Sequence, residues 1–217
     1  MRYIVANWKM NMDLKNVKKW LGNFEQRKFN NKVILSPSFP FLHLLQTLLE
    51  GSSIELAAQN FSDKQKGAYT GEVGLFQIKE FCKYCIVGHS ETKEGFDTIS
   101  RKRDLCLKES VTPIVCFTDP KDALKYYAKG SVLAWEDPQN ISHDGVFNEK
   151  PAQEVGRVLS EIKEKLPPET AVLYGGSVHE QNVAELAKIS GLGGVISGGA
   201  SLDPKRFERI INGFEQK

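Results

Sequence analysis

The sequence has no long hydrophobic run, little cysteine and almost no excess of charge. No stretch approaches the roughly 20 apolar residues that a membrane-spanning helix requires. The 29 lysines and arginines nearly balance the 27 aspartates and glutamates and form no basic patch that would suggest a nucleic-acid partner. Met1 leads directly into a strand-like segment, without a signal-peptide pattern. We therefore expect a cytoplasmic protein that binds neither membranes nor nucleic acid.

The four cysteines are too scattered to suggest a disulfide framework. Cys82 and Cys85 form a C-x-x-C pair, a spacing found in redox sites and as half of a zinc site. No second pair or suitably spaced histidine accompanies it, and Cys85 begins an apolar run typical of a buried strand. We therefore predict packing roles and no metal site, with a redox or metal module as the minor alternative.

Short apolar runs alternate with segments of helical periodicity eight times. The strand-like runs lie at residues 3–6, 33–35, 54–58, 84–87, 113–116, 132–135, 171–174 and 194–196. Each strand–helix unit averages about 27 residues, close to the minimum for a crossover between parallel strands. No G-x-G-x-x-G follows the first strand, which argues against an open dinucleotide-binding sheet. The pattern predicts an α/β fold, a single (β/α)8 barrel domain spanning residues 1–217, with a shortened fifth helix near residues 121–128.

The residues after the predicted strands are of types used in catalysis. In (β/α)8 barrels the active site lies at the carboxyl ends of the strands. The first, fourth and sixth strands are followed there by Asn7, Lys9, His89 and Glu136. Glycine-rich turns at 175–177 and 198–200 follow the seventh and eighth strands, where backbone N–H groups can hold a phosphate. The combination indicates a site that moves a proton on a small phosphorylated carbonyl compound.

Each of these features also has a plainer explanation. Alone, Lys9 would be a solvated charge, His89 a hydrogen-bonded structural histidine and Glu136 a loop carboxylate. The glycine turns would serve only tight connections. The functional interpretation depends on all of them falling at one end of one barrel. The remaining histidines, at positions 43, 143 and 179, are interpreted as surface residues without a role.

The motif ANWKMN at residues 6–11 resembles the opening signature of the triosephosphate isomerase family. Five further motifs match that family in order along nearly the whole chain: AQN at 58–60, GAYTGE at 67–72, VGHSE at 87–91, YGGS at 174–177 and GGASL at 198–202. The resemblance implies a (β/α)8 barrel that interconverts dihydroxyacetone phosphate and D-glyceraldehyde 3-phosphate in glycolysis and gluconeogenesis. It also implies that the reaction needs no cofactor.

The resemblance assigns roles to the four residues at the strand ends. Glu136 matches the general base that moves a proton between the two reacting carbons. His89 matches the electrophile that polarises the carbonyl, and Lys9 the cation that stabilises the enediolate. Asn7 matches a polar neighbour that helps to orient the substrate.

Further residues are assigned binding and supporting roles by the same resemblance. Contacts with the substrate phosphate are expected from Ser142, Ser177, Gly198 and Gly199. Glu91 would hold Lys9 in place, and Tyr174 supports the seventh-strand turn. Thr70 lies where the family's third loop reaches into a neighbouring subunit. We therefore expect a homo-oligomer, most simply a homodimer, with a tetramer as the alternative.

The segment after Glu136 departs from the family pattern. The family continues with a Pro-Val-Trp-Ala-Ile-Gly-Thr-Gly-like run, whereas residues 137–145 read DPQNISHDG. Asp137 replaces a hinge proline and adds a negative charge beside the expected base. Ser142 stands where a phosphate-binding glycine is expected. These departures leave open a second interpretation, a catalytically impaired barrel that binds phosphorylated ligands.

Overall fold

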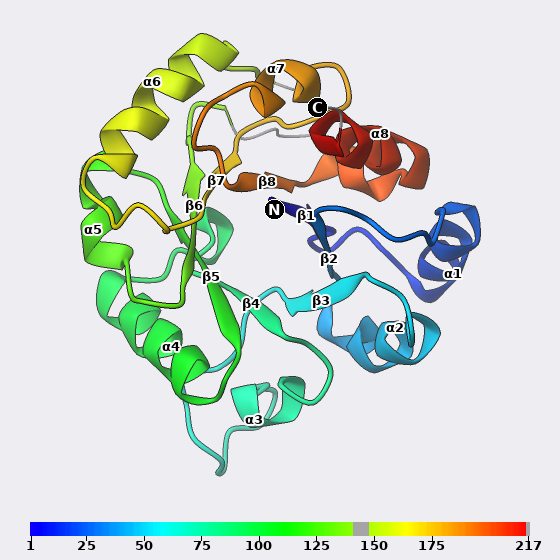
Figure 1. Cartoon of the computed structure of the whole chain (residues 1–217). Coiled ribbons are helices and arrows are strands. Elements are labelled where there is room, and N and C mark those ends of the chain that lie inside the picture. The colour runs from blue at the N-terminus through cyan, green and yellow to red at the C-terminus, as the bar shows by residue number, and fades with distance from the viewer. Residues whose placement is uncertain (141–147, 216–217) are drawn as a thin grey trace.

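The computed structural model describes residues 1–140 and 148–215 and shows a closed barrel of eight parallel strands (Figure 1). Each strand pairs with the next along the chain, and β8 closes the barrel against β1, with Tyr3 opposite Gly194. The strands are β1 Tyr3–Asn7, β2 Lys32–Ser36, β3 Glu55–Ala58, β4 Tyr84–Val87, β5 Thr112–Phe117, β6 Val132–Glu136, β7 Val172–Gly175 and β8 Gly194–Ser197. The predicted (β/α)8 fold is confirmed.

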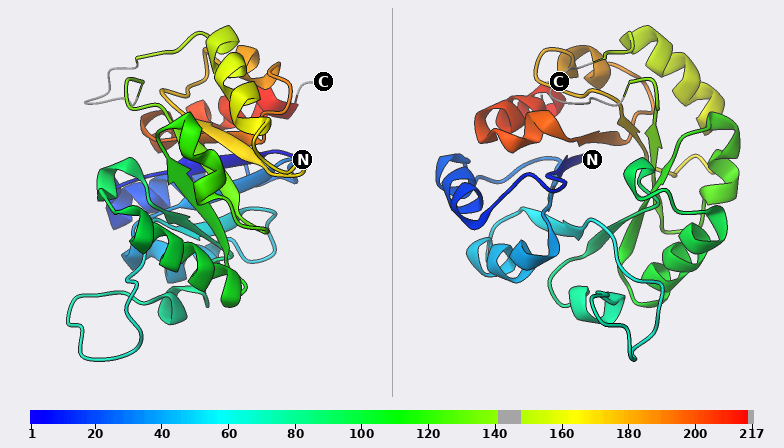
Figure 2. Two further views of the ribbon diagram at one scale, coloured as in Figure 1. Left: turned by 90° about the vertical axis from the view of Figure 1, so that its left-hand side faces the viewer. Right: turned by 180° about the vertical axis from the view of Figure 1, so that it is seen from behind.

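In the described part of the chain, eight α-helices follow the strands, and they form an outer ring around them (Figures 1 and 2). They are α1 Leu14–Asn23, α2 Leu42–Leu48, α3 Leu75–Ile78, α4 Phe96–Lys108, α5 Ala123–Tyr126, α6 Ala152–Lys163, α7 Val183–Ala187 and α8 Pro204–Glu215. The shortened fifth helix is α5, preceded by a 3₁₀ turn at Pro120–Asp122. None of the helices in the described part of the chain is long and apolar enough to cross a membrane.

Helix α1 illustrates how local sequence determines an element of the ring. The side chain of Asp13 accepts a hydrogen bond from the backbone N–H of Asn16 at 2.7 Å, which satisfies a free donor at the helix start. Val17, Trp20 and Leu21 recur at helical spacing and are buried, so one face of the helix packs inward. The opposite face carries lysines exposed to solvent.

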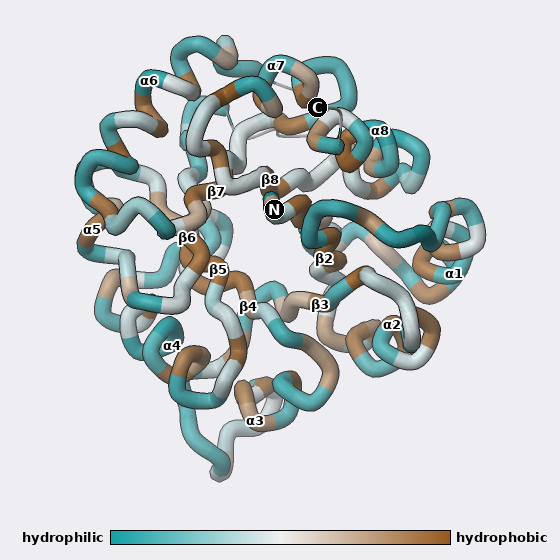
Figure 3. The backbone as a smooth tube through the Cα atoms, in the orientation of Figure 1, coloured by the Kyte–Doolittle hydropathy of each residue, from teal (hydrophilic) through white to brown (hydrophobic). Residues whose placement is uncertain are grey.

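The apolar core forms two layers separated by the strands. Side chains of strand residues alone fill the inner layer, among them Val5, Ile34, Ile86, Ile114, Leu173 and Ile196. The outer layer joins the other faces of the strands to the helices. Figure 3 shows this arrangement as hydrophobic strands enclosed by helices of mixed character. The alternation of side chains across each strand assigns successive residues to the two layers.

The loop between β3 and α3 projects from the barrel (Figure 2). A bridge between Ser62 and Gly74 closes its root, where the Ser62 N–H donates to the Val73 carbonyl at 2.8 Å. An ion pair of 2.8 Å between Asp63 and Arg101 links the loop to α4. Thr70 is exposed on this loop.

Candidate active site

Side chains from several strand ends converge on one cavity at the carboxyl end of the barrel. Asn7 ends β1, Glu136 ends β6, and His89 follows β4. The cavity is lined by Asn7, Lys9, His89, Glu136, Gly175, Gly176, Ser177, Val178, Ile196, Gly198 and Gly199. Charged and polar side chains therefore meet the two glycine-rich turns in one place.

His89 and Glu136 contact each other directly. The distance from His89 Nε2 to Glu136 Oε1 is 2.8 Å, and the two residues are 8% and 3% exposed. The backbone N–H of Glu91 donates to His89 Nδ1 at 3.3 Å, which assigns the ring proton to Nε2, the nitrogen that faces Glu136. The second carboxylate oxygen of Glu136 accepts a hydrogen bond of 2.8 Å from the Ser90 N–H. The carboxylate is thus held beside an imidazole N–H donor.

Lys9 is held at the cavity in an unusual backbone conformation. Its φ angle is +49°, in the left-handed region that costs a lysine conformational energy. The Asn7 side chain accepts from the Lys9 N–H at 3.1 Å, and the side chains of Gln59 and Ser38 donate to its carbonyl at 2.9 and 3.0 Å. These three bonds stabilise the strained turn.

The ammonium of Lys9 forms an ion pair with Glu91, at 2.6 Å. The expected contact between the two side chains is therefore present. Gln59 lies in the AQN motif, but its support of the Lys9 backbone could not be inferred from the motif alone. The pairing of β2 and β3 brings Gln59 to the carboxyl end beside β1.

The turn after β7 is packed too tightly for side chains larger than hydrogen at Gly176. A Cβ there would lie 2.3 Å from the Tyr174 hydroxyl oxygen. Tyr174 itself is buried, and its hydroxyl has no hydrogen-bond partner among the described residues. Burial and nearby carboxylates raise the pKa of this phenol well above its usual value. Tyr174 therefore packs beneath the turn as a neutral group.

Ser177 connects the turn after β7 to the chain on either side of residues 141–147. Its hydroxyl donates to the Asn140 carbonyl at 2.7 Å and accepts from the Asn148 N–H at 3.0 Å. Its φ angle is +46°, a second left-handed non-glycine residue at the cavity. The hydroxyl thus has structural partners, while Gly198 and Gly199, after the neighbouring strand β8, also line the cavity. The expected phosphate contact Ser142 lies outside the described residues.

The negative charge of Asp137 is paired. Its carboxylate lies 3.0 Å from the ammonium of Lys150, which also contacts Glu154 at 2.7 Å. The pKa of Lys150 is raised, chiefly by its hydrogen bond to Glu154 and also by Asp137. The sequence shows the extra charge beside the base but does not identify its partner, because Lys150 stands at the far end of the β6–α6 connection that Asp137 begins.

The structure corrects the interpretation of one histidine. His179 was expected on a helix surface, but it is only 2% exposed and lies before α7. Its Nε2 is 2.7 Å from Glu149 Oε1, a tertiary contact with the chain that precedes α6. His43 is exposed on α2, as expected, and the third, His143, lies outside the described residues.

The cysteines do not have the properties of a reactive or metal-binding site. Cys82 and Cys85 are buried, and burial raises the pKa of the Cys82 thiol to about 11. Reactive thiols have lowered pKa values and partial exposure. Within the described residues, no group of three or more histidine, cysteine, aspartate or glutamate side chains is arranged to hold a metal ion.

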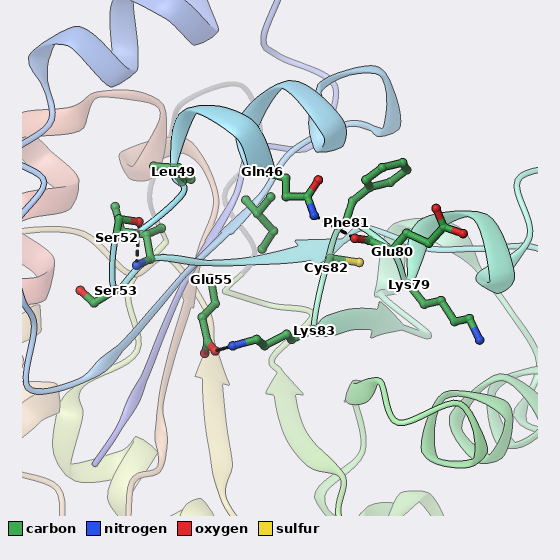
Figure 4. Close-up of a pocket in the computed structure, with 12 residues that line it drawn as sticks. Gln46, Leu49, Ser52, Ser53, Glu55, Lys79, Glu80, Phe81, Cys82 and Lys83 are labelled. Carbon is green, nitrogen blue, oxygen red and sulfur yellow. Dashed lines mark hydrogen bonds and ion pairs between the residues drawn. The ribbon is translucent and has the colours of Figure 1, made fainter.

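A second, larger cleft of about 450 Å³ lies at the amino ends of β3 and β4 (Figure 4). Its lysines already have partners, with Lys83 at 2.9 Å from Glu55 and Lys79 at 2.7 Å from Glu109. Gln46 donates to the Glu80 carbonyl across it at 2.9 Å. The smaller cavity has the chemically suitable set of groups, so we assign the candidate active site there.

Comparison with known proteins agrees with this geometry. The family model for triosephosphate isomerase matches residues 2–214. A triosephosphate isomerase of Aquifex aeolicus is 29% identical over 98% of this chain and 99% of its own length. Those of Dehalococcoides mccartyi and Thermodesulfovibrio yellowstonii are 33% and 32% identical, over 95% and 97% of this chain and 94% and 98% of their own lengths. The chain therefore belongs to the triosephosphate isomerase family.

Proposed function

We propose that this protein is an active triosephosphate isomerase that interconverts dihydroxyacetone phosphate and D-glyceraldehyde 3-phosphate without a cofactor. The observation that carries the proposal is the 2.8 Å contact between His89 and Glu136 in a cavity shared with Lys9 and two glycine-rich turns. A carboxylate, an N–H donor and a cation are the groups that proton transfer next to a carbonyl requires.

Glu136 is the base in this proposal. Its carboxylate takes the proton from C1 of dihydroxyacetone phosphate, and the electron pair of the broken C–H bond forms the C1–C2 double bond of an enediolate. Returning the same proton to C2 gives the aldehyde. The Glu136 carboxylate contacts His89 and accepts a hydrogen bond from the Ser90 N–H. When the substrate binds, contacts of Glu136 and His89 with the substrate must replace these contacts.

His89 and Lys9 stabilise the charge that develops on the substrate oxygens. The N–H at His89 Nε2 donates to the carbonyl oxygen and relays a proton between O1 and O2. The ammonium of Lys9 offsets the enediolate charge, and Asn7 orients the substrate beside it. Groups already held in place stabilise a transition state without reorganising during the reaction. The strained Lys9 backbone is consistent with such a fixed position.

The phosphate is proposed to bind at the turns after β7 and β8. Gly176 and Ser177 come from one turn, and Gly198 and Gly199 from the other. Turns without a Cβ allow backbone N–H groups to approach the phosphate oxygens closely. Ser142 remains a proposed further donor. Binding energy from the phosphate, remote from the reacting carbons, helps to orient them.

We further propose that the chain, as one domain, forms a homodimer in the cytoplasm through the loop after β3. Thr70 is exposed on that projecting loop, and Tyr69 and Phe76 are 47% and 43% exposed. Aromatic side chains are enriched where proteins meet. The four unpaired thiols suit a reducing compartment. Light scattering on the purified protein distinguishes a dimer from a monomer or a tetramer.

The activity is tested with glyceraldehyde 3-phosphate and the purified wild-type chain. Glu136→Ala should lower kcat by at least the roughly 10²- to 10⁴-fold that a positioned base contributes. Glu55→Ala is the matched control, because Glu55 is a carboxylate at the other end of the barrel. A wild-type chain no more active than Glu136→Ala, but able to bind phosphorylated ligands, would instead support the impaired barrel.

A further inference from the structure

Asp137 and Lys150 form a sheltered ion pair beside the proposed base. Asp137 directly follows Glu136, and Lys150 lies just before α6. The two side chains are 10% and 12% exposed, and the Nζ–Oδ2 distance is 3.0 Å. Solvent and salt screen such a pair much less than one on the surface. The charge of Asp137 is therefore compensated by Lys150 in surroundings that screen it little.

Other titratable groups surround this pair. Glu154 on α6 contacts the same ammonium at 2.7 Å but is itself 45% exposed. Burial raises the pKa of the Tyr174 phenol on β7, and the charges of Asp137, Glu154 and Glu149 raise it further. Among the described residues, Lys150 is the cation in contact with Asp137. Removing it would leave the negative charge of Asp137, the residue that directly follows Glu136, without this partner.

Asp137 also organises the backbone that leaves β6. Its Oδ1 accepts from the Gln139 N–H at 3.1 Å, and its carbonyl accepts from the Asn140 N–H at 2.9 Å. The Asn140 side chain donates to the Asn148 carbonyl at 2.9 Å. The ion pair and this bond both join the chain after Glu136 to the chain before α6. The position of Asp137 is therefore fixed both by hydrogen bonds to the residues that follow it and by the ion pair with Lys150.

We propose that Lys150 is a positioning residue for Glu136, acting by compensating and holding Asp137. The inference rests on the proposed isomerase function and goes beyond it, because it concerns a residue that contacts neither the cavity nor the base. An uncompensated negative charge beside Glu136 favours the protonated carboxyl, which cannot act as a base. Lys150 thus allows an aspartate to occupy this position while the base remains ionised.

Kinetics across the pH range test the proposal. In Lys150→Met, the pH at which kcat falls on the acidic side should rise by up to roughly one unit, at or below the lower end of the effect of a charge in direct contact. KM should change little, because Lys150 lies outside the cavity. Lys150→Arg should restore the wild-type profile, since it keeps the positive charge. Glu154→Gln is the matched control and should leave the profile unchanged.

Two variants at Asp137 test the direction in which the acidic midpoint of kcat moves. Asp137→Asn removes the negative charge that follows Glu136 and keeps the positive charge of Lys150, so it should move the acidic midpoint to lower pH. This variant supplies the test if Lys150→Met fails to fold. The double variant Asp137→Asn/Lys150→Met carries neither charge and should return to the wild-type midpoint. If both single variants keep that midpoint and differ only in thermal stability, the ion pair is merely structural and the proposal is wrong.

The outcome also separates this inference from the proposed function. A wild-type chain without isomerase activity above Glu136→Ala would refute the proposed function, and the positioning role would fall with it. An active wild type whose acidic midpoint does not respond to Asp137→Asn or Lys150→Met would refute the positioning role alone.

Discussion

The two ends of the barrel hold similar sets of charged groups in different surroundings. At the amino end, Lys32 donates to the Tyr84 hydroxyl and Tyr84 donates to Glu55, both at 3.0 Å, and Lys83 pairs with Glu55 at 2.9 Å. At the carboxyl end, Lys9 pairs with Glu91 and His89 with Glu136, at 2.6 and 2.8 Å. Contact distances alone therefore do not distinguish a candidate active site from a structural network.

The backbone does distinguish them. Near the amino ends of the strands, the residues with positive φ are mainly glycines, which adopt this conformation freely: Gly51, Gly130, Gly191 and Gly194, with Ser110 as the exception among the described residues. At the carboxyl end, Gly88 adopts it before His89, but so do three non-glycine residues: Lys9 and Ser177, which line the cavity, and Lys93. Strain carried by non-glycine residues persists only where surrounding contacts enforce it. The comparison indicates that the carboxyl end is built to hold particular side chains in place.

The largest expected effect contrasts the two ends of strand β4. His89 follows the strand and Tyr84 begins it, and each contacts a carboxylate. His89→Ala should lower kcat by about 10²- to 10⁴-fold, because the donor to the substrate oxygens is lost. Tyr84→Phe should leave kcat unchanged and lower the free energy of unfolding by about 1–3 kcal/mol, because the hydrogen bonds of the hydroxyl with Lys32 and Glu55 are both lost. Equal effects on kcat would break the comparison.

The next prediction contrasts two glycines. In Gly176→Ala, the added methyl group would meet the Tyr174 hydroxyl, so we expect a loss of about 1–3 kcal/mol in unfolding free energy and a raised KM. Gly22 lies in α1 with open space around its Cβ position, so Gly22→Ala should stabilise the protein by up to about 1 kcal/mol. Thermal unfolding and KM measurements on both variants check this. A tolerated Gly176→Ala would contradict the close packing beneath the turn.

A smaller effect is expected from the carboxylates that pair with lysines. Glu91→Gln removes the partner of Lys9, and because Glu91 is half-exposed we expect only a two- to fivefold loss in kcat/KM, roughly the value of a surface ion pair. Glu109→Gln removes the partner of Lys79 near the other end of the barrel and should leave kcat/KM unchanged. Steady-state kinetics of the two variants give the difference directly.

The smallest effect is expected from an ion pair that lies at the carboxyl end of the barrel but outside the cavity. Asp63 lies at that end but outside the cavity, and its hydrogen bond from Arg101 lowers the pKa of Asp63. A lowered folded-state pKa adds stability above the ordinary aspartate pKa and loses it as the pH falls through the lowered value. Arg101→Ala should therefore destabilise the protein by less than about 1 kcal/mol at pH 7, and the difference should disappear in acid. Its kcat should equal that of the wild type.

The fold could be predicted from the sequence because each strand is a short apolar run. Strands covered on both faces require apolar side chains on both, so runs such as Ile86-Val87 are visible without knowledge of their neighbours. The short α5 follows from the length of its connection. The positions of Asn7, Lys9, His89 and Glu136 follow from the same pattern, since parallel strands bring their carboxyl ends to one edge.

Contacts between residues that are far apart in the sequence could not be predicted. Lys150 and Asp137 belong to opposite sides of a long connection, and no local pattern relates them. The sequence predicts a helix-surface position for His179, yet its side chain is buried and contacts Glu149. The support that Gln59 gives to the Lys9 carbonyl depends in the same way on the closed order of strands. The contacts of these residues depend on tertiary packing, which the periodicity of the sequence does not reveal.

A crystal structure with bound 2-phosphoglycolate would test the central claim most directly. The carboxylate of this ligand represents the enediolate, and its phosphate represents that of the substrate. We predict the phosphate at the turns formed by Gly176–Ser177 and Gly198–Gly199, with the carboxylate in contact with Lys9 and His89. Binding in the amino-end cleft, or a ligand carboxylate that contacts neither Lys9 nor His89, would contradict the account.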